Sequence, residues 1–219
     1  VFMGTPDYAV PTLEALVNAG HTVAAVFAQP DKPVGRKHII TAPPVKVCAQ
    51  KHGIAVYQPN TLRDGGAEEI LKQIAPDVIV VVAYGKILPP EILRIPKYGC
   101  VNGHASLLPK YRGSAPVQWA IISGETVTGV TSQLMDEGID TGDILETAET
   151  EIGAEETADE LFGRLSVITA GLLVKTLADL ESGNVTPRKQ EEEKASYAPI
   201  IKKEMALLDF KEKTAEQIC

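Results

Sequence analysis

The sequence predicts an α/β protein with a doubly wound, mostly parallel open sheet. Two observations support this fold class. Through about residue 105, short apolar runs alternate with segments of helical periodicity, which is the rhythm of consecutive βα units. The run Val78–Ala83 is continuously apolar and rich in β-branched residues, as expected of a parallel strand buried on both faces. Because ligands bind at the carboxyl ends of the strands in such sheets, we expect the functional site there.

The other elements of this first part follow from local signals. Thr5 as N-cap and Pro6 as the first helical residue predict a helix over Asp7–Ala19. The remaining elements that we expect, in chain order, are the tail of a strand at Val1–Met3, a strand at Thr22–Ala28, a loop at Gln29–Ala42, a helix at Pro44–Lys51, a strand at Ile54–Tyr57, a helix at Ala67–Ile74, a short helix at Pro90–Leu93 and a strand at Cys100–His104.

The later part of the chain has a different pattern. It predicts a helix at Ala115–Ser123, a strand pair added at the sheet edge at Val127–Met135 and Asp143–Glu149, and a long helix at Thr157–Leu180 that Gly183 ends. The polar stretch from Asn184 predicts an extended linker, and Thr214 onward predicts the start of another helix. We therefore expect one main domain over residues 1–183, followed at 184–219 by a linker and the start of a truncated C-terminal domain.

Composition and charge argue against several classes of protein. With 219 residues and 44% hydrophobic content, the chain is long enough for a sizeable core. It has no run of about 18 uncharged apolar residues, so we expect no membrane span. The formal net charge of −8 argues against general nucleic-acid affinity. One local basic patch remains possible, because Lys32, Arg36, Lys37 and Lys46 lie close to a single acidic residue, Asp31, which leaves a local charge of +3 (four minus one).

Cysteine and histidine usage predicts no metal centre and no disulfide framework. The three cysteines are widely spaced and form no CxxC pair, and the four histidines show no metal-ligand spacing. A reducing, cytoplasmic environment is the default interpretation of this pattern.

The segment from Val101 to Pro109 carries the strongest chemical signal. Asn102 and His104 are two residues apart at the carboxyl end of a predicted strand, so their side chains face the same side. An amide donor beside an imidazole can stabilise a developing oxyanion and move a proton. Taken alone, such a pair is more often a polar pair that internal hydrogen bonds satisfy.

A second motif lies in the loop between the two late strands. Asp140 stands within Asp136–Asp143, where a carboxylate could orient His104 or a water molecule that carries a proton. Loops rich in Asp and Gly are common turns, and four acidic residues share this one. Spacing alone therefore leaves open which of these carboxylates, if any, has a function.

Together the two motifs resemble those of the folate-dependent formyltransferases. N-x-H-x-S-L-L-P is followed by D-x-G-x-D-T-G-D, with the Asn and the catalytic Asp 38 residues apart, and the resemblance covers the whole chain. It implies a Rossmann-like formyltransferase fold in which Asn102, His104 and Asp140 are catalytic and 10-formyltetrahydrofolate is the co-substrate, with no metal. The residues implied to contact the folate are Ser106, Leu107, Leu108 and Pro109 after the catalytic strand, and Ala83, Tyr84, Gly85, Ile87 and Leu88 in the loop that encloses the pterin ring.

Within this family the chain resembles the branch that formylates methionyl-tRNA, which implies initiator methionyl-tRNA as a partner and a role in translation initiation. The glycinamide ribonucleotide branch holds a substrate phosphate at the first helix N-terminus, where here Pro6 removes a donor and Asp7 adds negative charge. The segment after the second predicted strand resembles the inserted basic loop of the tRNA branch, so Lys32, Arg36 and Lys37 are the tRNA-binding candidates. A basic loop can also be a plain solvated surface. We expect a monomer that binds no membrane.

Three alternatives remain open. A formyltransferase that acts on an amino sugar nucleotide or on water would share the same three catalytic residues, and the basic loop argues against it. A nucleotide-binding module without catalysis would need a G-x-G-x-x-G turn after the first strand, which is absent. A folded but inactive domain is the third, because the tRNA enzymes of this family continue into a C-terminal β-barrel that helps to hold the tRNA.

Gly103 departs from the family pattern, which usually has Val or Ile between the Asn and the His. The position faces away from the predicted site, so the catalytic pair is intact. We expect a small void beside Gly103 and a locally weaker strand.

Overall fold

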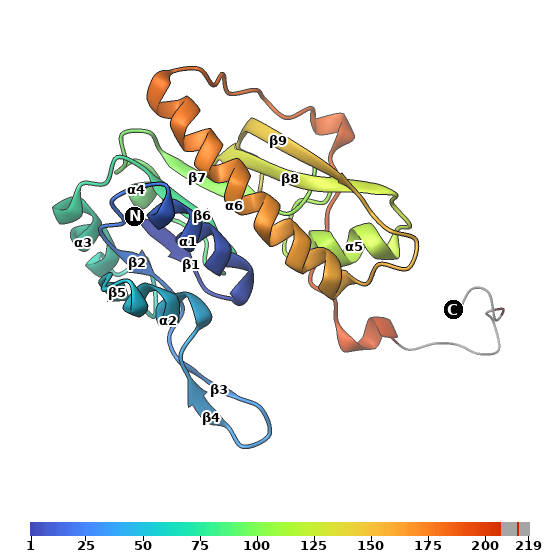
Figure 1. Ribbon diagram of the computed structural model, residues 1–219, viewed down its shortest axis with the longest axis horizontal. Helices are drawn as coiled ribbons and strands as arrows, with labels where there is room; N and C mark the ends of the chain where they lie inside the picture. Colours follow the sequence, from blue (N-terminus) through green and yellow to red (C-terminus); the bar gives the residue numbers. More distant parts are fainter. Residues whose placement is uncertain (207–213, 215–219) are drawn as a thin grey trace.

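The computed structural model describes residues 1–206 and residue 214 (Figure 1). Its centre is a seven-stranded sheet with the order β5-β2-β1-β6-β7-β8-β9. These strands are β1 (Phe2–Gly4), β2 (Val26–Phe27), β5 (Val56–Tyr57), β6 (Ile79–Val82), β7 (Cys100–His104), β8 (Val127–Leu134) and β9 (Asp143–Glu151).

Six α-helices are found in the described residues, and the longer ones flank the sheet (Figure 1). They are α1 (Val10–Asn18), α2 (Pro44–Lys51), α3 (Gly66–Ile74), α4 (Pro90–Leu93), α5 (Pro116–Ile122) and α6 (Ala158–Ser182), with 3-10 turns at Asp7–Ala9, Glu192–Lys194 and Lys203–Ala206. The helix expected from Thr214 onward falls, apart from Thr214 itself, outside the described residues.

The sheet has a parallel part and an antiparallel part. Strands β5, β2, β1, β6 and β7 are parallel, whereas β8 and β9 run antiparallel at one edge. The first strand lies in the middle and the strand order changes direction between β1 and β6, which is the switch point where ligands bind in such sheets. The predicted fold class and the added edge strands are therefore confirmed.

Alternation along the strands divides the core between the two faces of the sheet. Phe2 and Val80 belong to the cluster that includes side chains of α1, α2 and α6. Met3 and Val81, their neighbours in sequence, belong to the cluster that includes α3 and α4. Each such fully buried apolar side chain contributes roughly 1.5–3 kcal/mol, so burial on both faces fixes the sheet against its helices.

Helix α6 is 25 residues long and lies against one face of the sheet (Figure 1). It begins with a capping box, in which the Thr157 hydroxyl accepts from the Glu160 N–H and the Glu160 carboxylate accepts from the Thr157 N–H. By length and composition alone α6 is apolar enough to cross a membrane, although Arg164 and Lys175 interrupt its apolar residues. However, 50% of its most apolar 18-residue stretch is buried inside the protein. Leu165 and Leu173 are completely buried, each in a different core cluster.

The expected helix at Asp7–Ala19 is divided in two. The 3-10 turn at Asp7–Ala9 precedes α1, because Pro11 has no N–H to donate to the carbonyl of Asp7 and its ring crowds that carbonyl. Thr5 is not the N-cap that the sequence predicts. Its hydroxyl donates instead to the carbonyl of Tyr84, 3.0 Å away, and so joins the ends of β1 and β6.

Two expectations that follow in the chain are also corrected. The strand expected at Thr22–Ala28 shrinks to β2, because only its two residues pair with both β1 and β5. The loop expected at Gln29–Ala42 contains an exposed antiparallel hairpin of β3 (Lys32–Val34) and β4 (Ile39–Thr41). Its turn uses left-handed backbone at Gly35 and His38.

Between residues 188 and 199 the chain after α6 lies along the protein rather than in open solvent. Arg188 and Ile144 exchange two backbone hydrogen bonds of 2.8 Å, and Ser196 bonds to the backbone of Pro109 and Arg112. The expected extended linker therefore lies against the sheet edge and the loops beside it. The domain boundary between residues 183 and 184 stays a prediction.

Candidate active site

Asn102 and His104 lie on β7, at the carboxyl end of the sheet's parallel part. Asn102 is half-buried and His104 is buried, and the two side chains leave the strand on the same side. Asp140, in the loop between β8 and β9, reaches both: its Oδ1 lies 3.4 Å from the Asn102 Nδ2 and 3.5 Å from the His104 Nδ1. The structure thus brings together the three residues that the sequence singled out.

The backbone of Tyr111 determines how the His104 ring can act. The Nε2 of His104 lies 2.9 Å from the Tyr111 carbonyl oxygen. A carbonyl oxygen only accepts, so Nε2 donates its hydrogen to Tyr111, and a proton on Nδ1 would face the Asp140 carboxylate. Tyr111 itself has φ +59, a left-handed conformation that a non-glycine residue adopts at a cost of about 1–2 kcal/mol.

Asp140 is held by donors from several parts of the fold. Its Oδ1 accepts from the Gln133 Nε2 at 2.8 Å, and its Oδ2 accepts from the Gly113 backbone N–H at 2.9 Å. Asp140 also has left-handed backbone, with φ +54. With donors at both of its oxygens, the Asp140 carboxylate is held in one orientation.

The other acidic residues of this loop have different partners. The Asp136 carboxylate accepts from the Gly138 N–H and the Thr141 hydroxyl, which shapes the turn. The Glu137 carboxylate pairs with Arg94 at 3.2 Å on the surface. Geometry therefore distinguishes Asp140 from its neighbours, which spacing in the sequence could not do.

Gln133, Gly113 and Tyr111 are parts of this site that the sequence did not reveal. Gln133 lies opposite Asn102 in the antiparallel pairing of β7 with β8, which places both side chains on one face. The register of β7 against β8 depends on contacts between distant segments of the chain. The sequence shows that side chains alternate along β8, but not which residue of β7 faces Gln133. Gly113 and Tyr111 act through backbone atoms, for which residue type gives no signal.

The expected void beside Gly103 is not there. A Cβ added at this position would lie 2.7 Å from the Thr169 Cγ2 and 2.9 Å from the Leu173 Cδ1, both on α6. The space that a larger residue would fill is occupied by these two side chains of α6, which would have to shift to admit one.

The segment expected to enclose a pterin ring follows β6. Ala83 has φ +45 and Gly85 has φ +77, so the chain turns sharply at the end of the strand. The Tyr84 side chain is buried in the core, and its carbonyl accepts from Thr5 and Gln29. A cleft of about 680 Å³ opens beside this segment, and the residues that line it are Leu62, Arg63, Asp64, Gly65, Glu68, Ile87, Leu88, Pro89, Pro90, Glu91 and Glu137.

The second segment expected to contact folate follows β7. The Ser106 hydroxyl donates to the Lys110 carbonyl at 2.6 Å, and the Ser106 carbonyl accepts from the Thr131 hydroxyl. Ser106 and Leu108 are buried, whereas Leu107 and Pro109 are half-buried. The hydrogen bonds fix this segment beside His104, and its contact with folate stays a prediction.

The tRNA-binding candidates lie on the exposed hairpin. Lys32 is in β3, and Arg36 and Lys37 are in its turn, with all three exposed. Lys46 is set apart from them, since its ammonium group pairs with Asp31 at 2.8 Å and also donates to Gln58. The hairpin that carries the other three cations projects from the body of the protein (Figure 1).

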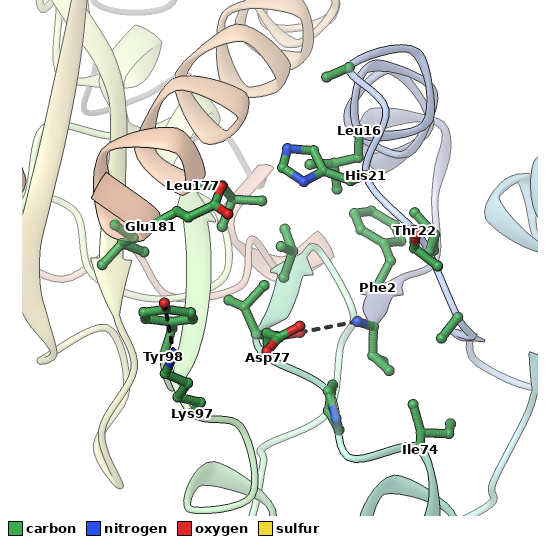
Figure 2. Close-up of a pocket in the computed structure, with 18 of the residues that line it drawn as sticks. Phe2, Leu16, His21, Thr22, Ile74, Asp77, Lys97, Tyr98, Leu177 and Glu181 are labelled. Carbon is green, nitrogen blue, oxygen red and sulfur yellow. Dashed lines mark hydrogen bonds between the residues drawn. The ribbon is translucent and has the colours of Figure 1, made fainter. Parts of the chain in front are cut away.

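A second groove, larger than the cleft beside the Ala83–Leu88 segment, lies at the opposite end of the sheet from Asn102. Figure 2 shows it, with Phe2, Asp77 and Tyr98 among its lining residues, and it has a volume of about 730 Å³. These residues surround the amino ends of β1 and β6. Because ligands of doubly wound sheets bind at the carboxyl ends, size alone does not make this groove the functional site.

Among the described residues, one group of side chains could hold a metal ion. It consists of Glu14, Cys48 and His52, whose ligand atoms lie within 4.8 Å of one another. Cys48 and His52 are four residues apart, in and just beyond the last turn of α2, so their side chains lie on one side of the helix. Burial and then the Glu14 carboxylate raise the pKa of the Cys48 thiol, which keeps it protonated and opposes binding of a cation. The group lies on α1 and at the end of α2, not beside Asn102.

The candidate active site therefore combines an amide donor, an imidazole whose Nδ1 faces a carboxylate, and that oriented carboxylate. This set can stabilise an oxyanion, accept a proton and hold the resulting imidazolium, as acyl transfer to an amine requires. Comparison with known proteins identifies the acyl group. The family model described as "Formyl transferase" matches residues 1–177. The chain belongs to the formyl transferase family.

Relatives in this family are similar over almost the whole chain. The methionyl-tRNA formyltransferase of Lachnospira eligens is 52% identical over 216 residues, and that of Acidobacterium capsulatum is 54% identical over 217 residues. Each match covers 99% of this chain and 69% or 70% of the relative, respectively.

Solved structures of formyltransferases share the fold. An N-formyltransferase from Helicobacter canadensis, in complex with folinic acid and dTDP-3-aminofucose, has a TM-score of 0.73 at 24% identity and covers 99% of this chain and 76% of that one. The phosphoribosylglycinamide formyltransferase of Streptococcus pneumoniae has a TM-score of 0.68 at 20% identity and covers 82% and 97%. The Rossmann-like formyltransferase fold is therefore confirmed.

Proposed function

We propose that this protein transfers the formyl group of 10-formyltetrahydrofolate to the α-amine of initiator methionyl-tRNA. The observation that carries the proposal is the meeting of Asn102, His104 and Asp140 at the carboxyl end of the sheet. The names of relatives that are 52% and 54% identical support methionyl-tRNA as the acceptor. The product, formylmethionyl-tRNA, serves translation initiation, and we infer a cytoplasmic monomer.

The transfer requires one C–N bond to form and another to break. As the methionyl nitrogen bonds to the formyl carbon, Asn102 donates a hydrogen bond to the oxyanion that develops on the formyl oxygen. Nδ1 of His104 accepts the proton that the nitrogen loses, directly or through water, while Asp140 stabilises the imidazolium. His104 then returns the proton toward N10 of the folate as the old C–N bond breaks. No proton or electron is left over.

The cleft beside the Ala83–Leu88 segment has an apolar side that suits a flat ring, formed by Leu62, Ile87 and Leu88. Its polar lining consists of Arg63 and four acidic residues, Asp64, Glu68, Glu91 and Glu137. Glu137 comes from the loop that holds Asp140, so the cleft reaches that loop. We infer that this cleft is part of the folate site.

The acceptor is tested by an assay with defined substrates. The 219-residue chain is given 10-formyltetrahydrofolate and either methionyl-tRNA or a dTDP-linked amino sugar, and the formylated product is measured. We expect formylmethionyl-tRNA as the product. Formylation of the amino sugar alone would overturn the proposal, and folate binding without formylation of either acceptor would favour the inactive-domain alternative.

The role of Asp140 is tested in the same assay. Asp140→Asn keeps the shape and removes the charge that stabilises imidazolium, so we expect turnover to fall by about 10²-fold or more. Asp143→Asn is the matched control, because Asp143 belongs to the same motif but lies on β9 and faces Lys189 at 3.9 Å. Near-normal turnover of Asp140→Asn would remove Asp140 from the mechanism.

The hairpin is tested by salt dependence. If Arg36 contacts a tRNA phosphate, Arg36→Ala should raise the KM for methionyl-tRNA and reduce the slope of log affinity against log salt by about one. Lys51→Ala, an exposed cation on α2, is the control. An unchanged KM and an unchanged slope would show that the hairpin is a plain solvated surface.

A further inference from the structure

The described chain after α6 crosses both loops of the candidate active site. We call residues 188–199 the strap. Its Arg188 pairs with Ile144 on β9, and its Ala198 donates to the Arg112 carbonyl at 2.7 Å and accepts from the Ala115 N–H at 3.1 Å. The strap thus joins the loop that supplies Asp140 to the loop that supplies the Tyr111 carbonyl.

Gln190 lies at the centre of the strap's contacts and has all its hydrogen-bonding groups engaged. Its Nε2 donates to the carbonyl of Asp140 at 2.8 Å and to that of Gly142 at 2.7 Å. Its Oε1 accepts from Arg112, with Nε at 3.0 Å and Nη2 at 2.9 Å. A side-chain amide has two donor hydrogens and one acceptor oxygen, and here each has a partner.

Arg112 gives this contact a rigid base. Its side chain is only 1% exposed, and the Glu192 carboxylate completes a fork on the guanidinium at 2.8 and 3.0 Å. Paired in this way, the buried cation fixes the Gln190 oxygen in the plane of the guanidinium. The Gln190 amide is therefore aimed at the Asp140 loop by groups outside that loop.

The Asp140 loop needs such support because its backbone is strained. At φ +54, Asp140 occupies a conformation that costs about 1–2 kcal/mol for a non-glycine residue. Without a partner for its carbonyl, the loop could relax and turn its carboxylate away from His104. Displacements of about 1 Å in catalytic groups can cost about 10²-fold in rate.

We propose that Gln190 is a positioning residue for the formyl transfer, which holds the Asp140 loop in its strained conformation by binding the carbonyls of Asp140 and Gly142. Gln190 does not itself touch Asn102 or His104; it acts through the backbone that carries the Asp140 carboxylate. This inference rests on the proposed function where kcat is measured, whereas the effect on hydrogen exchange in the Asp140 loop does not depend on that function.

The kinetic test uses two substitutions at one position. Gln190→Ala removes both donors, and Gln190→Glu keeps an acceptor for Arg112 while it turns a carboxylate toward two carbonyl oxygens. We expect both to lower kcat by about 10-fold or more, with the KM for folate changed by less than about 2-fold. Glu193→Ala, an exposed strap residue, is the control and should stay within about 2-fold of wild-type kcat.

A double-mutant cycle separates positioning from general damage. If Gln190 acts through Asp140, adding Gln190→Ala to Asp140→Asn should lower kcat by less than about 2-fold further, because the group that Gln190 positions is already disabled. Losses that multiply in full would overturn the proposal. So would Gln190→Ala and Gln190→Glu variants that both fold and keep wild-type kcat.

Hydrogen exchange gives a readout that does not need the reaction. In Gln190→Ala we expect backbone amides of residues 136–142 to exchange at least about 10-fold faster, and those of β6 to be unchanged. Should wild-type protein formylate no methionyl-tRNA, the proposed function fails while this measurement still tests the role of Gln190. Unchanged exchange in residues 136–142 would overturn that role.

Discussion

The two sides of the candidate active site are held by different means. Asn102 and His104 lie on β7, whose backbone pairs with β6 on one side and β8 on the other. Asp140 lies in a loop with left-handed backbone, and single donors from Gln133, Gln190 and Gly113 hold it. Residues on a paired strand are positioned by many backbone bonds, whereas a residue on a loop depends on each of its few partners. The Asp140 side should therefore be the more easily disturbed by distant substitutions.

The largest effect is expected on the strand side, at the group that meets the oxyanion. Asn102→Ala removes the amide donor, so turnover should fall by about 10²–10³-fold while the KM for folate changes little. The backbone of β7 is unaffected, and thermal unfolding should shift only slightly. A variant that keeps more than about a tenth of wild-type turnover would show that Asn102 is not an essential oxyanion donor.

A smaller loss is expected when the loop side loses one donor. Gln133 is 1% exposed, and its Oε1 has no hydrogen-bond partner in the described structure. Gln133→Met keeps the volume and removes both polar atoms, so we expect turnover to fall by about 10-fold with stability equal to or above wild type. Measured together, kcat and the midpoint of urea unfolding test this. A loss of stability that matches the loss of activity would contradict a specific role toward Asp140.

The contact between β7 and α6 allows a test of stability without loss of a catalytic group. Gly103→Val should destabilise the fold by about 1–3 kcal/mol, because its side chain would overlap Thr169 and Leu173. Adding Thr169→Ser removes the Cγ2 that lies 2.7 Å from the new Cβ and should restore part of this loss. Urea unfolding of the single and the double variant measures the change in unfolding free energy. If the two substitutions destabilise the fold additively, the contact with Thr169 is not the cause of the loss in Gly103→Val.

The smallest expected effect concerns pH and the loop that carries Tyr111. The Tyr111 hydroxyl and then Lys110 donate to Glu125 and hold the pKa of that carboxyl below its usual value. A lowered pKa in the folded state means that Glu125 stabilises the fold above its unfolded pKa, and that this contribution is lost as pH falls through the folded pKa. Relative to wild type, Glu125→Gln should therefore be slightly less stable near pH 7, by well under about 1 kcal/mol.

Unfolding measured from about pH 7 to about pH 3 covers the titration of a glutamate. The difference in unfolding free energy between wild type and Glu125→Gln should shrink toward zero as the pH falls. A difference that stays constant over this range would show that the charge of Glu125 does not contribute.

The sequence predicts the strand side of the candidate active site better than the loop side. The bounds of β7 at Cys100–His104 and of α2 at Pro44–Lys51 match those expected, and the proline at the start of α2 is a strong local signal. Alternation along that strand is enough to place Asn102 and His104 on one face. Their partner Asp140 could be selected among four acidic residues only through resemblance to a family.

The parts that were missed depend on contacts between distant segments. Gln133 faces Asn102 only through the register of β8, and Gln190 reaches Asp140 across 50 residues of chain. The polar composition of the strap predicts a solvated linker, and no local pattern reveals that Arg112 would be buried beneath it. Likewise, Gly103 suggests a void until the side chains of α6 are in place.

Backbone conformation has a consequence for how this protein responds to selection. Ala83, Tyr111 and Asp140 are non-glycine residues with φ between +45 and +59. Ala83 follows β6, Tyr111 follows β7, and Asp140 lies in the loop between β8 and β9. Glycine would relieve strain at each position, so a screen for heat tolerance alone could enrich it at Ala83 and Tyr111 as well as at Asp140. Improved thermostability and slower formyl transfer would then evolve together, and laboratory evolution of this enzyme would have to select for both properties at once.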